Sequence, residues 1–353
     1  MISIGNRPIG ENHPVFIIAE AGVNHNGDLQ LAKKLVEVAA EAGADAVKFQ
    51  TFKTENIILP QAPKSTYHVE TTGNEQSWFD LLKSQELTRE MHVALIEHCK
   101  KVGIMFLSTP YDEESADLLD ELDVPGYKIA STDANNVPFL KYIARKKRPM
   151  ILSTAMCSFD EVRESVEAIR AEGLKDLIVL HCTGNYPAKL QDSNLRAMLT
   201  LKKQLNVPVG YSDHVLDPLN CIAAIAMGAV VYEKHFTMDK NLPGPDHRAS
   251  LNPAELTEMV QMIRKTEQAM GSAEKRVLPS EAENRQKLRK SVVTRVSVRQ
   301  GERLTAEMLA IKRPGTGFRP ADYDKLIGQV VTHDLPMNHV LNSNDLVDGK
   351  SLR

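Results

Sequence analysis

The sequence contains few cysteines and no long apolar segment. Four cysteines occur among 353 residues, and none forms a C-x-x-C pair. This pattern excludes a disulfide framework and favours reduced thiols in a cytoplasmic protein. The longest uncharged apolar run, residues 221–232, is shorter than the ~20 residues that a membrane-spanning helix needs. No basic stretch followed by an apolar stretch opens the sequence, so we expect neither a secretory signal nor membrane association.

Aromatic residues are also scarce, at 5%, beside 42% hydrophobic and 25% charged residues. This composition is typical of soluble enzymes and excludes disorder, collagen-like repeats and a coiled coil. The sequence has neither G-x-G-x-x-G nor G-x-x-x-x-G-K-[ST]. The nucleotide-binding fingerprints of doubly wound sheets are therefore missing.

The net charge of −3 is unevenly distributed along the chain. Residues 276–353 hold 14 basic and 9 acidic residues, a net charge of +5, which leaves −8 for residues 1–275. Nucleic-acid binding is disfavoured because the basic excess is small and is not interleaved with aromatic residues. A basic module that docks on an acidic surface, or supplies a cation to an anionic ligand, explains the asymmetry better.

Short apolar runs alternate with amphipathic helical patterns over the first 275 residues. The runs predict eight buried parallel strands, at residues 15–19, 46–49, 104–107, 126–130, 150–152, 177–181, 207–211 and 230–233. The helical patterns lie at residues 29–42, 88–102, 113–122, 137–146, 159–172, 193–205, 219–227 and 253–270. Eight such units predict an α/β fold, a (β/α)₈ TIM barrel, over residues 1–275.

Three other segments do not follow this alternation of strands and helices. Residues 52–87 show no clear period, and a connection of this length in a compact domain is usually functional, often a lid. Residues 276–290 are predicted to be a linker with a short helix. Residues 291–353 are predicted to form a small β-rich domain. A domain of this size is only marginally stable on its own.

Polar side chains follow the predicted strands at the end where barrel enzymes carry their chemistry. Lys48 and Lys128 lie in otherwise apolar strands, where an unpaired ammonium is costly. Serine and threonine residues follow the neighbouring strands at Ser108, Thr109, Ser131, Ser153, Thr154 and Ser212. Two lysines ringed by hydroxyls are suited to a phosphate group.

Two histidines, His214 and His235, end adjacent strands. They form either half of an open Mn²⁺ or Mg²⁺ site, completed by water and substrate oxygens, or a hydrogen-bonded structural pair. His25, His181 and His247 are weaker candidates. The spacing has neither the HExxH nor the three-histidine pattern of a tightly bound zinc.

Two acidic residues are further candidates. Glu20 ends the first strand, and it acts either as a general base or sugar anchor, or only as the ion-pair partner of Lys48. Asp246 follows the eighth strand, where a solvated turn aspartate is the simpler interpretation.

Taken together, these motifs resemble the sialic acid synthase family, the nonulosonic acid synthases. In chain order they are EAGVNHNG (20–27), KFQT (48–51), STP (108–110), YKIAS (127–131), LST (152–154), HCT (181–183), YSDH (211–214), EKHFT (233–237) and PGPD (243–246). The KRPG turn at 312–315 resembles the C-terminal antifreeze-like (SAF, β-clip) domain of those enzymes.

The resemblance implies a transferase that condenses phosphoenolpyruvate with an N-acetylated hexosamine, N-acetylmannosamine first, to a nine-carbon 2-keto sugar acid (N-acetylneuraminate) and phosphate. It also implies a manganese or magnesium ion on His214 and His235, and a domain-swapped homodimer in which the SAF domain caps the partner barrel. By motif, the phosphoenolpyruvate site is Lys48, Thr109, Lys128, Ser131, Ser153, Asn185 and Ser212. The acceptor-sugar site is Glu20, Tyr186, Asp246 and Arg313. Glu20 and Asp133 are the implied catalytic carboxylates.

Two positions depart from the family pattern. Asp133 stands where the family often has a glutamate, which shortens that side chain by one methylene. Asn185 lies one position later than the corresponding asparagine of some members.

The sequence is also compatible with three alternative functions. The first is an N,N'-diacetyllegionaminate synthase acting on a 6-deoxy diacetamido sugar, whereas a pseudaminate synthase is disfavoured by the Pro-Gly-Pro-Asp sequence. The second is a metal-dependent aldolase that uses pyruvate, and it needs no two-lysine phosphate site. The third is an ice or carbohydrate binder, which the charged C-terminal module disfavours.

Overall fold

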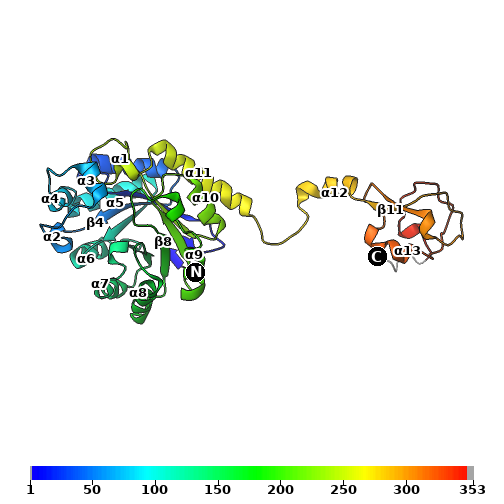
Figure 1. Ribbon diagram of the computed structural model, residues 1–353, viewed down its shortest axis with the longest axis horizontal. Helices are drawn as coiled ribbons and strands as arrows, with labels where there is room; N and C mark the ends of the chain where they lie inside the picture. Colours follow the sequence, from blue (N-terminus) through cyan, green and yellow to red (C-terminus); the bar gives the residue numbers. More distant parts are fainter. Residues whose placement is uncertain (1, 348–353) are drawn as a thin grey trace. The chain divides into compact units, whose positions relative to one another are not determined.

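The computed structural model describes residues 2–347. The chain divides between Gly271 and Ser272 into two compact units, which are described separately. Figure 1 shows the first unit as a ring of helices around a set of strands. Within the described residues, no helix combines the length and apolar character needed to cross a membrane.

Eight parallel strands form the first unit's barrel, as predicted. They are β3 (Phe16–Gly22), β4 (Ala46–Thr51), β5 (Met105–Pro110), β6 (Tyr127–Ile129), β7 (Met150–Ser153), β8 (Leu177–Cys182), β9 (Val209–Asp213) and β10 (Val231–His235). Their hydrogen-bonded order is β5-β4-β3-β10-β9-β8-β7-β6, with β5 and β6 adjacent at the remaining seam. The first and last strands pair directly, with Phe16 opposite Val231 and Glu20 opposite His235. This closure brings side chains from both ends of the unit to one mouth.

Helices cover the outside of the barrel and follow the predicted strand–helix alternation. They are α1 (Leu29–Glu41), α5 (Arg89–Val102), α6 (Glu113–Glu121), α7 (Val137–Ala144), α8 (Phe159–Ala171), α9 (Ala197–Leu205), α10 (Leu219–Ala226) and α11 (Pro253–Met270). Local sequence fixes several of their starts: Ser158 and Glu161 form a capping box at α8, as do Asn252 and Glu255 at α11. Such caps satisfy the free N–H groups of the first turn.

A short hairpin that the sequence analysis did not predict closes the amino end of the barrel. It consists of β1 (Ile2–Ile4) and β2 (Arg7–Ile9). Its isoleucines are buried against the barrel interior, in one cluster with Phe16, Ile18 and Ile178. The opposite, carboxyl end is therefore the open mouth of the barrel.

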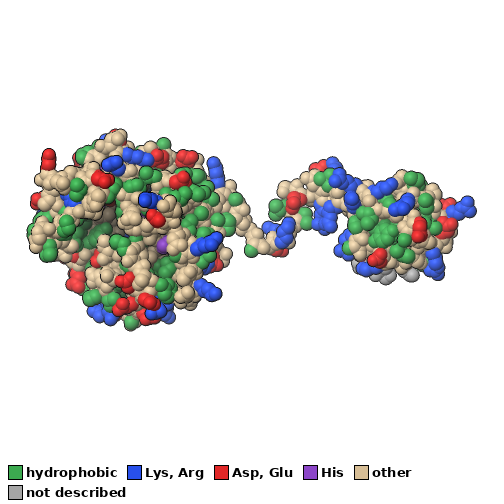
Figure 2. Space-filling view, in the orientation of Figure 1, with side chains coloured by type: hydrophobic (Ala, Val, Ile, Leu, Met, Phe, Trp, Pro, Cys, Tyr) green, Lys and Arg blue, Asp and Glu red, His purple; other side chains and the backbone are tan. Residues whose placement is uncertain are grey.

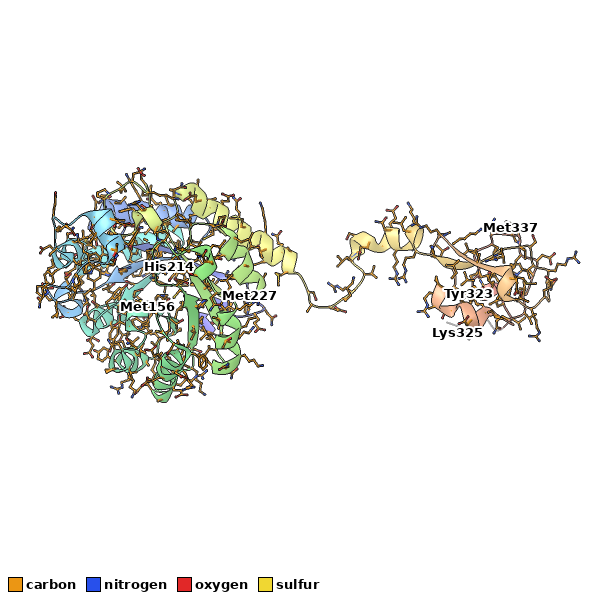
Figure 3. All side chains as sticks on the ribbon, in the orientation of Figure 1. Met156, His214, Met227, Tyr323, Lys325 and Met337 are labelled. Atoms are coloured by element: carbon orange, nitrogen blue, oxygen red, sulfur yellow. The ribbon has the colours of Figure 1, made fainter. Side chains whose placement is uncertain are left out.

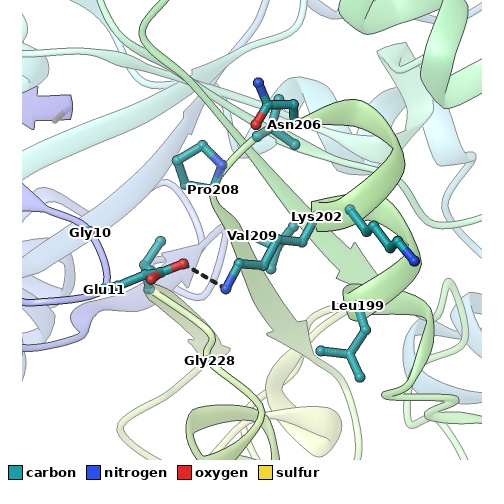
Figure 4. A pocket seen from close by; sticks show the side chains of 11 residues that line it. Gly10, Glu11, Leu199, Lys202, Asn206, Pro208, Val209 and Gly228 are labelled. Atoms are coloured by element: carbon teal, nitrogen blue, oxygen red, sulfur yellow. Dashed lines mark ion pairs between the residues drawn. The ribbon is translucent and has the colours of Figure 1, made fainter. Parts of the chain in front are cut away.

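A shallow groove of about 580 Å³ lies beside this amino end, near the starts of β9 and β10 (Figure 4). An ion pair between Glu11 and Lys202, 2.7 Å long, crosses it. Much of the remaining lining is backbone and aliphatic, from residues such as Gly10, Pro208 and Gly228. The groove brings together none of the predicted site residues.

The aperiodic segment after β4 folds into three short helices, α2 (Thr54–Ile57), α3 (Thr66–Thr72) and α4 (Trp78–Ser84). The rings of His68 and Trp78 stack 4.3 Å apart and join α3 to α4. Beneath them, Leu82 packs with Phe52 of the barrel mouth.

The second unit contains α12 (Ala282–Leu288), an antiparallel pair β11 (Ser291–Thr294) and β12 (Leu309–Lys312), and α13 (Tyr323–Leu326). Its own small core includes Val292, Leu309 and Leu341. Isolated bridges replace longer strands at Val330, Val331 and Val340. Lys and Arg side chains lie mainly around the edge of its visible surface, with a hydrophobic patch near the middle (Figure 2).

Candidate active site

Side chains from all eight strand ends or their following loops surround a cavity of about 120 Å³ at the mouth. His214 and Met156 lie over the barrel centre in Figure 3, and both line this cavity. The cavity brings together ten of the predicted site residues: Glu20, Lys48, Thr109, Lys128, Ser131, Ser153, Tyr186, Ser212, His214 and His235. The structure thus brings most of the predicted residues together at one end of the barrel.

Four buried charges form an alternating chain along the cavity. Lys48 Nζ lies 2.6 Å from Glu20 Oε2 and 3.7 Å from Glu233 Oε2. Lys128 Nζ lies 3.5 Å from Glu233 Oε1. The four side chains are at most 5% exposed. Each ammonium thus has a carboxylate neighbour, as buried charges require.

Hydroxyl groups complete this chain. Lys48 donates to Thr109 Oγ1 at 2.9 Å, and Lys128 donates to Ser153 Oγ at 2.7 Å. Ser212 donates to Glu233 Oε1 at 2.8 Å. The two ammonium groups and three of the hydroxyls that were predicted to bind phosphate, those of Thr109, Ser153 and Ser212, therefore lie within one cluster of ion pairs and hydrogen bonds.

The two carboxylates differ in their protonation. Burial, helped by the nearby Glu233 carboxylate, raises the pKa of Glu20 to about 7 against the attraction of Lys48. Burial also opposes ionisation of Glu233, but Lys128 and Lys48 outweigh it and lower the pKa of Glu233 to about 2. Glu20 can therefore hold or release a proton near neutral pH, while Glu233 stays ionised.

Gly22, which has a left-handed backbone conformation, lies beside the carboxyl groups of Glu20 and Asp246. Gly22 has φ of +53°, and a β-carbon there would lie 3.4 Å from Glu20 Oε1 and 3.6 Å from Asp246 Oδ2. A side chain at this position would be strained by its backbone, while its β-carbon would make ordinary van der Waals contact with both carboxyl groups.

The two predicted metal ligands are close neighbours at the mouth. The ring centroids of His214 and His235 are 5.6 Å apart, and the Tyr186 ring lies 4.0 Å from the His214 ring. His214 Nδ1 donates to the Thr183 carbonyl oxygen at 2.6 Å, which leaves its Nε2 with a free lone pair. His235 Nδ1 is buried and has no hydrogen-bond partner within residues 2–347.

These imidazoles fit a divalent cation. Burial lowers the pKa of His214 to about 4 and that of His235 well below its usual value, so both rings are neutral. Neutral imidazoles bind cations such as Mn²⁺. No group of three or more His, Cys, Asp or Glu suited to a metal occurs in the described part of the chain. A cation here would take its remaining ligands from water and substrate.

The other four predicted residues lie outside the cavity lining. Asp246 is at its edge, with Oδ2 3.8 Å from His235 Nδ1, and burial raises its pKa to about 6. Asp133 lies in the turn after β6 and accepts from Asn136 Nδ2 at 3.2 Å. Asn185 is exposed, and Arg313 is exposed in the second unit.

The cavity residues that were not predicted include Gln50, Tyr111 and Glu233. Glu233 is central, because it contacts two lysines and a serine from three other strands. Its position two residues before His235, on the same face of β10, is the sequence signal that could have identified it.

Comparison with known proteins gives consistent matches. The NeuB family model matches residues 35–275, and the SAF domain model matches residues 289–347. The chain is 46% identical to the N,N'-diacetyllegionaminic acid synthase of Legionella pneumophila, over 94% of each chain. It is 37% identical to human N-acetylneuraminate-9-phosphate synthase, over 92% of this chain and 90% of the human one. The crystal structure of the Bacillus subtilis spore coat polysaccharide biosynthesis protein SpsE matches with a TM-score of 0.67 and 38% identity, covering 98% of both chains.

Proposed function

Because the chain belongs to the NeuB family, with a C-terminal SAF domain, we propose that it condenses phosphoenolpyruvate with an N-acetylated hexosamine. The products are a nine-carbon 2-keto sugar acid and phosphate. The observation that carries the proposal is the buried Lys48 and Lys128 pair, set among hydroxyls at the barrel mouth. Pyruvate-dependent aldol chemistry has no phosphate to bind and does not need this pair.

Phosphoenolpyruvate is assigned to the lysine end of the cavity. The two ammonium groups and the hydroxyls of Thr109, Ser153 and Ser212 would exchange their present partners for phosphate and carboxylate oxygens. Ser131 borders the same space, and Asn185 joins this site only if its loop turns inward. Holding both substrates together accounts for much of the rate enhancement.

The acceptor sugar is assigned to the acidic end of the cavity, at Glu20, Tyr186 and Asp246. Carbon three of phosphoenolpyruvate attacks the aldehyde of the open-chain sugar, and water adds at carbon two. The C2–O bond of the resulting tetrahedral intermediate then breaks and releases phosphate. Glu20 holds or supplies a proton at Oε1, the oxygen that does not pair with Lys48, and Asp133 orients the sugar or the water.

His214 and His235 would hold a divalent cation, Mn²⁺ or Mg²⁺. When bound, such a cation supplies Lewis-acid polarisation of the aldehyde oxygen. Excess chelator should abolish activity, and Mn²⁺ or Mg²⁺ should restore it. Full activity of the chelated protein would contradict this assignment.

Two acceptors are candidates. N-acetylmannosamine follows from the site motifs, and the relatives include a human N-acetylneuraminate-9-phosphate synthase. The higher identity, 46%, to the Legionella N,N'-diacetyllegionaminic acid synthase favours a 6-deoxy diacetamido sugar. A panel of N-acetylated sugars with phosphoenolpyruvate, followed by product mass and phosphate release, tests both. Turnover of pyruvate without phosphate release would instead indicate an aldolase.

We also propose a homodimer in which the SAF domain of one chain caps the barrel of its partner and supplies Arg313 to the acceptor sugar. The family resemblance supports this arrangement, as does the opposite net charge of the two regions. A guanidinium group suits the carbonyl and hydroxyl oxygens of an N-acetylated sugar.

A further inference from the structure

A buried ion pair lies directly behind the two mouth histidines. Asp213 precedes His214 at the end of β9, and Lys234 precedes His235 in β10. Alternation along a strand turns these neighbours to the opposite face, away from the cavity. Asp213 and Lys234 are register partners across the two strands. Lys234 Nζ lies 2.6 Å from Asp213 Oδ2, and their side chains are 3% and 1% exposed.

The Asp213 carboxylate is the centre of a saturated network. Oδ2 also accepts from the Tyr232 hydroxyl at 2.7 Å. Oδ1 accepts from Asn220 Nδ2 and from the Val215 backbone N–H, both at 3.1 Å. Lys234 additionally donates to the Val215 carbonyl oxygen. The network therefore fixes the backbone on both sides of His214, and joins it to β10 and to α10.

We propose that Asp213 and Lys234 are a positioning pair that sets the spacing and orientation of the His214 and His235 imidazoles for a divalent cation. The two rings are held separately: among the described residues, no hydrogen bond joins them, and His235 Nδ1 has no partner at all. Their relation depends on the register of β9 with β10 and on the turn after Asp213. The Asp213–Lys234 ion pair holds both the strand register and this turn in place.

Stability alone explains this arrangement poorly. A buried ion pair often contributes little net stability compared with well-packed apolar residues, because both ions must be desolvated. Supporting groups around a metal site, by contrast, commonly change metal affinity 10- to 100-fold when they are removed. The inference rests on the divalent cation of the proposed function, so its test measures that cation directly.

The experiment measures Mn²⁺ binding to the full-length protein without substrates, by calorimetry and by the EPR signal of free Mn²⁺, together with thermal unfolding. Asp213→Asn should weaken Mn²⁺ binding about 10- to 100-fold. The double variant Asp213→Asn/Lys234→Met leaves no unpaired buried charge and should show the same loss with less destabilisation. Tyr232→Phe removes one donor, keeps the ion pair, and should give a smaller loss.

The matched control is Thr51→Val on β4, away from the histidines. The Thr51 hydroxyl bonds with Ser108 Oγ at 2.6 Å and His92 Nε2 at 2.8 Å, so its loss also breaks a buried network. We expect Thr51→Val to lower the melting temperature without changing Mn²⁺ affinity.

Two results would overturn the inference. If the folded double variant and Tyr232→Phe both bind Mn²⁺ as tightly as the wild type, the pair is only structural. If the wild-type protein binds no divalent cation while still releasing phosphate from phosphoenolpyruvate, the metal assignment fails and the positioning role fails with it, but the proposed reaction stands.

Discussion

Lys128 shares its carboxylate neighbour with Lys48. Lys128 Nζ lies 3.5 Å from Glu233 Oε1, and Lys48 Nζ lies 3.7 Å from Glu233 Oε2. Burial lowers the pKa of Lys128. A bound anion should therefore stabilise the protonated form of Lys128. Lys48, by contrast, is tied to Glu20 at 2.6 Å. The two lysines therefore have different electrostatic surroundings, although their sequence contexts look alike.

We expect Lys128→Ala to raise the KM for phosphoenolpyruvate about 10- to 100-fold, with little change in the KM for the sugar. The substitution removes a charge-assisted hydrogen bond worth roughly 1.5–3 kcal/mol. Lys146→Ala is the control, because Lys146 pairs with Asp117 on the outer wall. A larger effect on the sugar than on phosphoenolpyruvate would mean that the two subsites are reversed.

His25 provides a pH-dependent contribution to stability. Burial, with the neighbouring His92 and His247, lowers the pKa of His25 to about 4, and the Gly27 N–H donates to its Nδ1 at 3.0 Å. The unfolded chain takes up this proton near pH 6.5, whereas the folded chain does not until about pH 4. The stability that neutral His25 contributes is therefore fully present above about pH 6.5, and it is lost as the pH falls from 6.5 towards 4.

In His25→Asn, an amide oxygen can still accept from Gly27, but the titration is removed. The wild type should lose about 2 kcal/mol more unfolding free energy than the variant between pH 7 and pH 5. Urea unfolding at both pH values measures this difference, with His13→Asn in the turn before β3 as the control. Equal losses in the wild type and in His25→Asn would contradict the assignment.

At the scale of elements, the connection between β4 and α5 stands apart from the other strand–helix units. It contains α3 and α4 and the chain's single tryptophan, Trp78, stacked on His68. Tyr67, next to His68, has a buried hydroxyl with no hydrogen-bond partner in the described residues. Burial raises the pKa of Tyr67 to about 12, with the nearby Asp246 carboxylate adding to the shift. This segment thus reaches the acidic edge of the mouth, as a lid over the acceptor would.

Tryptophan emission should therefore change when the acceptor sugar binds. Trp78 is the only tryptophan, so emission reports this segment alone. His68→Ala removes the stacking partner and should reduce the change on sugar binding by at least about half, since an aromatic pair contributes ~0.5–1.5 kcal/mol to fixing the ring. Unchanged emission at saturating concentrations of both substrates would show that the segment does not respond to the ligands.

The elements also show what sequence patterns can and cannot predict. The eight strands are predictable because each contains a short buried run of mostly apolar residues. The β1–β2 hairpin is not, because its strands have three residues each and one contains Pro8. The α3 helix has no buried residue, so no apolar period marks it. Among site residues, the lysines and histidines stand out, but the place of Glu233 depends on partners from several strands.

At the scale of the whole molecule, Arg313 makes the proposed dimer testable. Neither Glu20→Ala nor Arg313→Ala chains should be active alone. After subunit exchange, a mixed dimer has one barrel with intact Glu20 and an intact Arg313 from its partner. Random mixing should restore about a quarter of the wild-type activity, since half of the dimers are mixed and each has one complete site.

Verified exchange with no recovered activity would place Arg313 in its own chain's site, or outside both. Truncation after residue 275 provides a second check. The shortened chain should keep the barrel, because the unit boundary lies at Gly271, but it should bind the acceptor sugar poorly.

The pairing of β3 with β10 has a consequence for how the chain folds during its synthesis. Phe16 can pair with its register partner Val231 only after Val231, which lies 215 residues later in the chain, has been synthesised. At ~5–20 residues per second, the ribosome needs roughly 10–40 s to produce that partner. Throughout this interval the edge of β3 that pairs with β10, which is apolar apart from Glu20, has no final neighbour and is open to pairing with other chains. The first strand of the barrel to leave the ribosome is thus the one whose second neighbour is made last, and we expect a chaperone to act on the nascent chain during this interval.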